Sequence, residues 1–560
     1  MKNIIYYLAQ TTKELEFIID KNQTICVVPL NLEILLYCIE KGINYLKLEK
    51  IINNNFHSKT LTLVNKLEKK ISYGSIEYQS IRNELKSIIR FKIYNIAILL
   101  KILKFIGKNK IILSGWRGIN PNLYKSNDNF YISQLIFDLN IKLNLEIKEK
   151  ATKVIINQKK MYDYDIIFER NRLKNNSKII FLNNTAYNFW RIIKEAKKNK
   201  YQIIFPIFKK MNFFKKGILY LYNVYPIFLK KKSKINKFEF YNKNKLRIIY
   251  KDIDISNIIK KTIDEKLYHL NDLLAKAKIL KQFFRKQKIS LAILNLLRGL
   301  DGCIAEILKK TPIPTVSVSH GTVSEYFNQV DKIYKYNILE SVFAGDCKYT
   351  AISSKISLSA YKKFKIKSKP LMGNIIFSGL KNVRKTNNIL FAVTLKDFEN
   401  FQLHGVETHF EFINNLVTLS RLAKKNNLNF IINLHPSQHN QINRLMNIFP
   451  KLEFTKSKIE SVLKKSFATI SFSSSVIEDS ITSNIPVILF DPHNRYKHCK
   501  AETKLNKTSR GIYYISNEEK LLKCINFIKD NIDKIETKKN NFNDDYKYNI
   551  NNNLFSLIKT

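Results

Sequence analysis

Three short polar sequences each follow a run of residues that predicts a buried β-strand. They are His320-Gly321 after residues 315–319, His435-Pro436 after 429–434, and Ser473-Ser474-Ser475 after 468–472. In open α/β sheets, ligands bind just beyond the carboxyl ends of the strands. Because all three sequences fall at such ends, we expect them to share one ligand-binding groove.

The serine triplet is suited to phosphate binding. A helix is predicted over residues 476–483, and free backbone amides at a helix start attract a phosphate, to which serine hydroxyls add donors. Glu478 lies one turn further along, where it can accept hydrogen bonds from ribose hydroxyls. The simpler alternative is an ordinary capping box between Ser475 and Glu478. Because the other two sequences accompany the triplet, we favour phosphate binding.

His435-Pro436 can place an imidazole beside the same ligand. Proline holds the preceding residue in an extended conformation, which fixes the direction of the histidine. The ring could then donate to a nucleotide phosphate or to a base edge. The alternative is a strand-end histidine that is hydrogen-bonded to the backbone.

His320-Gly321 is the first candidate for catalysis. The pKa of histidine lies near neutrality, so His320 could remove a proton from an acceptor hydroxyl, and Gly321 permits a tight turn or close ligand approach. The alternative is a turn residue that only packs. Asp301, which opens a predicted helix after a strand at 291–296, is the second choice, and Glu325 and Glu306 are rival carboxylates.

Several other kinds of site are disfavoured. The sequence contains no GxGxxG, P-loop, GxSxG or HExxH motif, which argues against dehydrogenases, NTPases, esterases and zinc proteases. Asp252 and Asp254 have a metal-binding spacing, but they lie in a charged loop and are expected to be solvated. Six cysteines without a CxxC pair predict reduced thiols and a cytoplasmic protein. We expect no bound metal or cofactor.

The charge is strongly positive: 96 Lys and Arg against 46 Asp and Glu give +50. Lysine crowds the whole sequence, so most of this charge is a compositional bias spread over solvated faces. No nucleic-acid module is recognisable, and no nucleic-acid partner is expected. Peripheral contact with an anionic membrane remains open. No segment predicts a signal peptide or a span, because basic residues interrupt the apolar stretch 88–106.

The elements that must position these residues alternate between strand and helix. Alternation in the first hundred residues and repeated βα units over 388–515 predict an α/β protein with two Rossmann-like domains facing a cleft. We divide the chain into residues 1–381, with about 125–250 as an insertion candidate, a linker, residues 388–515, and a helix and polar tail over 516–560.

The second half resembles the donor-binding domain of GT-B glycosyltransferases. The HP element followed by the Ser-Ser element resembles bacterial sialyltransferases, polysialyltransferases and Kdo transferases of capsule and lipopolysaccharide assembly, which use CMP-activated acidic sugars. The resemblance covers residues 288–492 and implies that His435, Pro436 and Ser473 to Ser475 contact CMP. In the families that it resembles, the catalytic base is often an acidic residue that precedes a glycine after a buried strand. The sequence TVSVSHGTVSEY (315–326) matches this context but has His320 at the acidic position. A histidine before glycine resembles CDP-glycerol glycerophosphotransferases, which are also GT-B folded.

The resemblance implies a displacement at the anomeric carbon of a nucleotide sugar, with a CMP-sugar as the favoured donor and a glycan or lipid-linked acceptor. His320 or a nearby carboxylate would take the acceptor proton, and Ser474, Ser475 and His435 would stabilise the leaving phosphate. The expected location is cytoplasmic, with peripheral contact to the inner face of the cytoplasmic membrane. A CDP-glycerol-type glycerophosphotransferase, a sugar-nucleotide epimerase and a non-catalytic basic binding protein remain alternatives.

Overall fold

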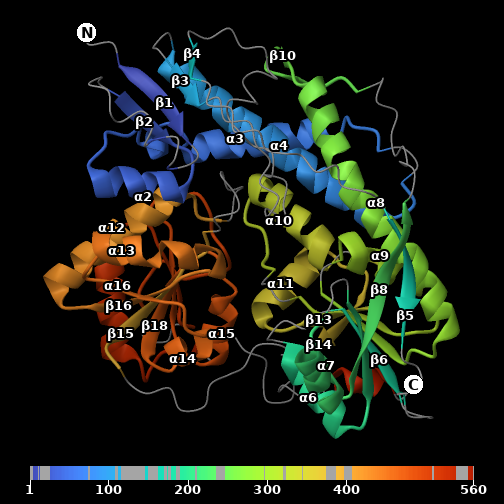
Figure 1. Cartoon of the computed structure of the whole chain (residues 1–560). Coiled ribbons are helices and arrows are strands. Elements are labelled where there is room, and N and C mark those ends of the chain that lie inside the picture. Colours follow the sequence, from blue (N-terminus) through green and yellow to red (C-terminus); the bar gives the residue numbers. More distant parts are fainter. Residues whose placement is uncertain are drawn as a thin grey trace.

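The protein consists of three lobes, each built around a sheet (Figure 1). The computed structural model describes residues 4–9, 25–73, 76–107, 111–114, 145–148, 162–168, 178–183, 189–207, 211–234, 246–295, 297–319, 323–343, 345–373, 386–395, 406–506, 510–537 and 553–558, with single positions at 12, 15 and 173. We call the lobes N-terminal, central and C-terminal in chain order.

The N-terminal lobe holds a four-stranded parallel sheet in the order β2-β1-β3-β4. Its strands are β1 (Ile5–Ala9), β2 (Ile25–Pro29), β3 (Ile111–Ser114) and β4 (Leu145–Lys148), and its helices are α2 (Leu32–Lys41), α3 (Asn54–Glu68) and α4 (Gln79–Ile106). α4 contains the apolar stretch 88–106, and most of its side chains are buried. The apolar stretch that its basic residues exclude as a span is thus part of a largely buried helix.

The central lobe holds an eight-stranded sheet in the order β14-β13-β12-β11-β6-β7-β8-β5. All pairings are parallel except that of β5 with β8. The strands are β5 (Tyr162–Ile167), β6 (Ile179–Leu182), β7 (Gln202–Ile207), β8 (Val224–Lys234), β11 (Leu291–Leu294), β12 (Thr315–Ser317), β13 (Tyr349–Ile352) and β14 (Lys369–Met372). The helices are α6 (Trp190–Lys198), α7 (Phe213–Leu221), α8 (Ser256–Lys286), α9 (Gly299–Lys309), α10 (Gln329–Val342) and α11 (Lys355–Lys363).

The C-terminal lobe holds a six-stranded parallel sheet in the order β17-β16-β15-β18-β19-β20. Its strands are β15 (Asn388–Ala392), β16 (Asn429–Asn433), β17 (Glu453–Thr455), β18 (Ser466–Ser471), β19 (Val487–Phe490) and β20 (Ile512–Ile515). The helices are α12 (His409–Asn426), α13 (Ile442–Ile448), α14 (Ile459–Leu463), α15 (Val476–Thr482) and α16 (Glu518–Asn531), with a 3₁₀ helix η5 (Pro436–Gln441). β18 is buried along its whole length, as expected of a parallel strand covered on both faces.

The strand orders of the last two sheets confirm the predicted fold class. Counted along the chain, the C-terminal sheet runs 3-2-1-4-5-6, which is the doubly wound Rossmann order. The central sheet follows the same rule from β6 outward, with β7 and β8 on one side and β11 to β14 on the other. The range 1–381 contains three sheets rather than one, because β1 to β4 pair only among themselves and residues 249–254 form a separate two-stranded sheet. Residues 162–234, inside the insertion candidate, supply four strands of the central sheet.

The lobes are tied together by segments distant in sequence. α2 packs on α12 and α13 of the C-terminal lobe, and α4 packs on α8 and α9 of the central lobe. Gly302 allows this last approach, since a Cβ atom there would lie 2.2 Å from Cβ of Ser80. The end of the chain returns to the central lobe, where Phe555 packs edge-on against Tyr201 in the same core as β6 and β7.

Two further features bear on the sequence expectations. All six cysteines are buried and free. Among the helices of the described residues, none combines the length and apolarity that a bilayer span requires.

Candidate active site at two facing sheet edges

The strand register of the C-terminal sheet brings two of the three predicted sequences to one edge. Ala392 of β15 aligns with Asn433 of β16 on one side and with Ser471 of β18 on the other. His435 and Ser473 each follow two residues beyond these aligned positions. Adjacent strands lie about 4.8 Å apart, so the ends of β16 and β18, which His435 and Ser473 follow, lie about 10 Å apart on either side of β15. This is the point where the strand order reverses, which is where doubly wound sheets bind ligands.

His435 is held in a defined tautomer. It is the N-cap of η5, with its side chain accepting from the backbone N–H of Ser437 at 3.3 Å, and its Nδ1 also lies 2.8 Å from the Ser437 hydroxyl. Because a backbone N–H can only donate, Nδ1 is an acceptor, and the neutral ring carries its proton on Nε2. This is the tautomer that can donate a hydrogen bond to an anion beyond the strand end.

The serine triplet forms a turn rather than a capping box. Ser475 is the N-cap of α15 but makes no side-chain capping hydrogen bond. Instead, the Ser474 hydroxyl accepts from the backbone N–H of Val476 at 3.2 Å, and the Ser474 N–H donates to the Ser471 hydroxyl at 3.1 Å. α15 has only seven residues, so its dipole adds little. Any phosphate affinity here must come from the turn itself and its hydroxyls.

Glu478 lies in a contact between lobes. Its Oε1 accepts from the hydroxyls of Ser354, at 2.7 Å, and Ser357, at 3.4 Å, both at the start of α11 in the central lobe. The side chain is fully buried, and burial raises the pKa of this carboxyl to about 7 although both serines lower it. Among the described residues, its Oε2 has no hydrogen-bond partner.

In the central lobe, Asp301 lies at the corresponding reversal of strand order. Its Oδ1 accepts from the side-chain amide of Asn183, just after β6, and its Oδ2 accepts from the backbone N–H of Asn295, just after β11, at 2.9 Å. Asp301 is buried, at 8% exposure. Both carboxylate oxygens thus join the ends of β6 and β11.

The remaining predicted residues lie in different surroundings. His320 and Gly321 fall outside the described residues, although β12 and the following Val318 and Ser319 lead to them. Glu325 is partly exposed and pairs with Lys363 at 3.9 Å. Glu306 accepts from the backbone N–H groups of Gln79 and Ser80, at 2.9 and 2.8 Å, and so caps the start of α4.

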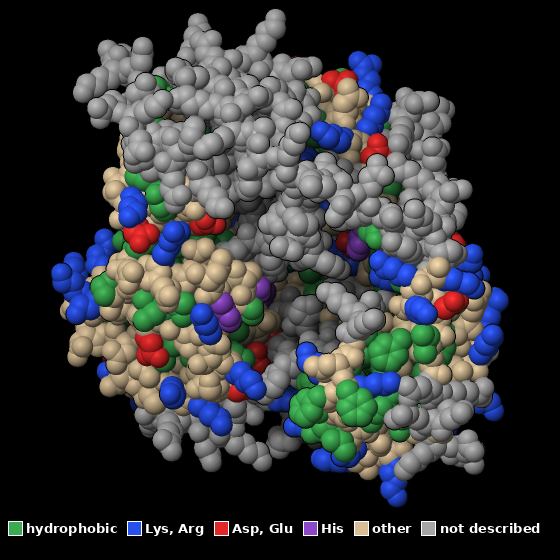
Figure 2. All heavy atoms as spheres, viewed as in Figure 1, with side chains coloured by type: hydrophobic (Ala, Val, Ile, Leu, Met, Phe, Trp, Pro, Cys, Tyr) green, Lys and Arg blue, Asp and Glu red, His purple; other side chains and the backbone are tan. Residues whose placement is uncertain are grey.

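The carboxyl edges of the central and C-terminal sheets face each other. Lys335 of α10 donates to the carbonyls of Lys497, at 3.2 Å, and His498, at 3.0 Å, while it pairs with Asp331 at 3.1 Å. The Ser324 hydroxyl also donates to the carbonyl of His498. Together with the Glu478 contact, these bonds join loops that follow β12, β13, β18 and β19. Figure 2 shows the surface hollowed between these two lobes.

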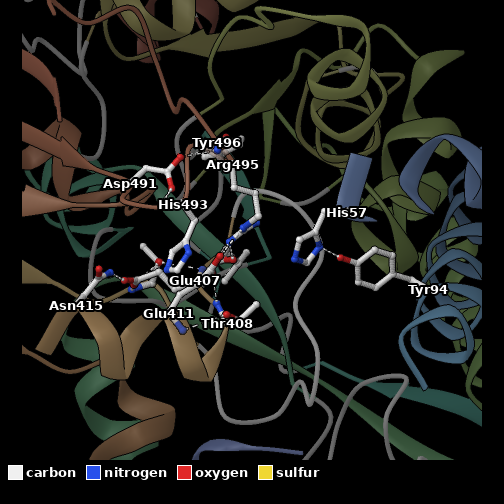
Figure 3. A network of polar contacts seen from close by, with 12 residues as sticks. His57, Tyr94, Glu407, Thr408, Glu411, Asn415, Asp491, His493, Arg495 and Tyr496 are labelled. Carbon is white, nitrogen blue, oxygen red and sulfur yellow. Dashed lines mark hydrogen bonds and ion pairs between the residues drawn. The ribbon is translucent and has the colours of Figure 1, made fainter. Parts of the chain in front are cut away.

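A buried polar network lies beneath the C-terminal edge (Figure 3). Glu407 accepts from the backbone N–H and the hydroxyl of Thr394, at 2.9 and 2.7 Å, and from the amide of Asn415 at 2.9 Å. Burial raises the pKa of Glu407 despite these bonds. Thr394 follows β15, so the network fixes the strand end that His435 and Ser473 flank.

Glu411 and Arg495 form a fully buried ion pair in the same network. Arg495 donates from Nε to Oε1 and from Nη2 to Oε2 of Glu411, both at 2.7 Å, and its guanidinium stacks over the Phe472 ring. Burial alone would raise the pKa of Glu411, but Arg495 outweighs it and lowers the pKa to about 2. The pair joins the start of α12 to the loop after β19.

The N-terminal lobe meets this network through His57 of α3, which is hydrogen-bonded to Tyr94 of α4 (Figure 3). Burial lowers the pKa of His57 to about 3, so its ring is neutral. The residues of this network were not among the predicted site residues. Thr408 and Glu411 do form the capping box that T-x-x-E spacing signals, but no local pattern indicates that Arg495 pairs with Glu411.

Within the part of the chain that the structure describes, no group of three or more His, Cys, Asp or Glu side chains could hold a metal ion. Asp254 of the strand β10 (Ile253–Asp254) instead accepts from the Ser256 N–H at 2.8 Å. Two doubly wound lobes with facing carboxyl edges define a GT-B-like α/β protein.

The chain is similar to solved structures of other proteins at low sequence identity. No family model and no curated protein matches the chain. Similar solved structures include S. aureus MnaA with UDP (TM-score 0.41, 11% identity, covering 67% of this chain and 93% of that one). A Neisseria meningitidis UDP-GlcNAc 2-epimerase bound to UDP-GlcNAc gives a TM-score of 0.40 at 11% identity over 68% and 99% of the two chains. A Methanocaldococcus jannaschii UDP-GlcNAc 2-epimerase gives 0.36 at 14% identity over 66% and 96%. The fold assignment rests on the strand orders.

Proposed function

We propose that the protein is a metal-independent GT-B glycosyltransferase that moves a sugar from a nucleotide donor to a glycan or lipid-linked acceptor. The observation that supports this most is the shared edge, where His435 and Ser473 flank the end of β15 opposite a second doubly wound lobe. A nucleotide phosphate at this edge would meet the Nε2 proton of His435 and the hydroxyls of Ser473, Ser474 and Ser475. These donors stabilise negative charge as the nucleotide leaves, which is the role a metal has elsewhere.

For the donor we propose a CMP-sugar that carries an acidic sugar such as sialic acid or Kdo. The HP and Ser-Ser resemblance supports it, and Gly321 would let the ligand approach closely. Pro436 contributes by fixing His435 at the start of η5. Glu478 would hold the two lobes together through Ser354 rather than bind ribose, because its Oε1 already accepts two hydroxyl hydrogens.

For the catalytic base we propose His320. Asp301 uses both carboxylate oxygens to join β6 and β11, which favours a positioning role for it. Glu325 is paired with Lys363 at the long distance of 3.9 Å and is the remaining carboxylate candidate. His320 would take the proton of the acceptor hydroxyl as that oxygen attacks the anomeric carbon and the nucleotide phosphate departs.

For the acceptor side we propose a peripheral position on an anionic membrane from the cytoplasmic face, through α7. Phe213, Phe214 and Leu221 of this helix are 91%, 75% and 68% exposed, beside the exposed Lys215. Figure 2 shows hydrophobic side chains gathered on the lower part of the central lobe, where Figure 1 places α7. Exposed aromatic residues next to lysines are the combination that binds anionic interfaces. α7 follows the carboxyl end of β7, so docking would bring this edge near a lipid-linked acceptor.

The experiment is a thermal-unfolding panel with CMP, CDP, UDP and GDP. A ligand at a hundred times its Kd adds about 2.7 kcal/mol to the free energy of unfolding. We expect CMP to stabilise the protein and the effect to be lost in His435→Ala. His439→Ala, which changes a second histidine of η5, is the matched control and should keep it.

The outcomes separate the alternatives. Stabilisation by UDP alone would move the donor to a UDP-sugar, and conversion of UDP-GlcNAc without any acceptor would replace the transferase with an epimerase. Salt-sensitive RNA or DNA binding without any nucleotide response would favour the basic binding protein. If CMP stabilised the wild type and His435→Ala equally, the shared edge would not be the nucleotide-binding site.

A further inference from the structure

A second concave site lies between the N-terminal and central lobes. It is a cavity of about 650 Å³, lined on one side by α3, α4 and the turn between them and on the other by one face of α10. Ligand pockets have volumes of about 300–1,000 Å³, so a sugar-sized molecule fits. None of the residues that the sequence predicted for the site lines this cavity.

One wall of the cavity is a buried, fixed ion cluster. Arg90 is 8% exposed and donates to Oε2 of Glu68 from Nε, at 3.1 Å, and from Nη2, at 2.9 Å. The Tyr73 hydroxyl donates to the other oxygen of Glu68 at 2.5 Å, and Arg90 lies 3.7 Å from Glu340 across the lobe boundary. The charge of Arg90 is therefore neutralised by two carboxylates, so Arg90 forms part of the cavity wall but adds no net positive charge to it.

The rest of the lining is cationic. Five basic and two acidic side chains line the cavity, and both acidic ones face Arg90. This leaves Lys69, Arg82, Lys86 and Lys332. Within the described ranges, no carboxylate forms an ion pair with Lys69, Lys86 or Lys332, and Nε of Arg82 is buried without an acceptor. Lys86 also interacts electrostatically with Glu340, but five cations against two carboxylates leave the lining with an excess of positive charge, which attracts an anion.

The same cavity offers aromatic surface. Tyr73 and Tyr336 both line it, and the Nζ atom of Lys86 lies 5.8 Å from the centre of the Tyr73 ring. A tyrosine presents an apolar ring and a polar hydroxyl, which suits a molecule with an apolar face and several polar groups. The lining thus combines charge for an anion with surface for a ring.

We propose that this cavity binds a negatively charged saccharide, either a sugar phosphate or a sugar acid. This inference rests on the proposed function in one respect, because it takes the bound saccharide to be the acceptor of the proposed transferase and names its chemical class. Lys86 from α4 and Lys332 from α10 hold the anionic group from both lobes, and the tyrosine rings pack against the sugar.

The test is isothermal titration of the full chain with glucose 1-phosphate, glucuronate and neutral glucose. We expect saturable binding of one or both anions and none of glucose. The double variant Lys86→Met, Lys332→Met should weaken anion binding at least about tenfold, since each lysine supplies a charge-assisted hydrogen bond to the anion. The control Lys59→Met, Lys101→Met removes two exposed lysines of α3 and α4 that do not line the cavity, and it should bind like the wild type.

The outcomes are distinct. Binding of glucose 1-phosphate alone assigns a sugar phosphate, and binding of glucuronate alone assigns a sugar acid. Failure of both anions to bind, or equal binding by the two double variants, overturns the proposal. Titration of CMP into the His435→Ala variant and into the Lys86→Met, Lys332→Met variant separates the two sites. If CMP binding is lost only in His435→Ala, the cavity is independent of the nucleotide edge. The cavity proposal and the nucleotide-site proposal can then fail separately.

Discussion

The carboxylate of Glu478 in the C-terminal lobe accepts a hydrogen bond from the hydroxyl of Ser354 in the central lobe at 2.7 Å. The two residues are 124 positions apart, and each follows the carboxyl end of a strand, β18 for Glu478 and β13 for Ser354. This contact joins the two edges on which the proposed reaction depends. The carboxyl of Glu478 is also fully buried, so the stability that this contact provides depends on pH.

Stability should fall as the pH rises because of Glu478. Burial raises the pKa of this carboxyl from 4.5 to about 7, so the folded protein retains a proton that the unfolded chain has lost. The proton held by Glu478 in the folded state contributes its full share to the free energy of unfolding below pH 4.5. This contribution declines as the pH rises and is gone above pH 7. It amounts to about 3 kcal/mol at most. Glu478→Gln should be as stable as the wild type at pH 5 and more stable at pH 8 in urea unfolding. Parallel pH profiles for the two proteins would contradict this.

Removing one member of the Glu411–Arg495 pair should be costly. Arg495→Met leaves Glu411 as a buried charge without its partner, and we expect a loss of about 3–5 kcal/mol in the free energy of unfolding. The double variant Arg495→Met, Glu411→Met should recover much of this loss. Arg421→Met breaks the more exposed pair with Glu518 and should cost less than about 1 kcal/mol. Similar losses in Arg421→Met and Arg495→Met, measured by denaturant unfolding, would count against the argument.

Asp301 and His320 should differ in what they control. Asp301→Asn has only one acceptor oxygen for the two donors on β6 and β11, and it should lower the free energy of unfolding by about 1–3 kcal/mol. His320→Ala should instead lower kcat of sugar transfer by about 10²–10⁴-fold with little loss of stability. Glu325→Gln should change neither strongly. A large loss of kcat in Asp301→Asn without any loss of stability would make Asp301 the base.

Membrane binding should depend on α7. Phe213→Ser with Phe214→Ser should lower partitioning onto phosphatidylglycerol-containing vesicles at least about tenfold, because burial of one phenylalanine contributes about 1.5–3 kcal/mol. Phe105→Ser is the matched control, since Phe105 of α4 is 55% exposed on another lobe. Vesicle co-sedimentation at low and high salt measures the effect. Unchanged partitioning in the double variant would exclude α7, and a concentration-dependent dimer lost in that variant would assign the face to a second copy of the chain.

Much of the fold could be predicted from local pattern. Apolar runs followed by polar turns and amphipathic segments predicted the strands and helices of residues 388–490, because each βα unit buries its own strand. The last strand of this sheet, β20, was not predicted. The same pattern predicted that His435 and Ser473 follow strand ends, because each comes where an apolar run gives way to polar residues. The capping box between Ser475 and Glu478, which was the alternative to phosphate binding, does not form, because the Ser474 hydroxyl accepts from the Val476 N–H and Glu478 turns towards Ser354.

The sequence by itself determined which residues end strands, because periodicity and turn chemistry act over a few residues. Tertiary structure alone decided that β1 to β4 form a separate sheet, that Arg495 pairs with Glu411 from 84 positions away, and that Phe555 packs in the central lobe. These contacts depend on how three lobes close on one another. The free energy that selects them comes from burial and charge pairing between distant segments, which no local pattern records.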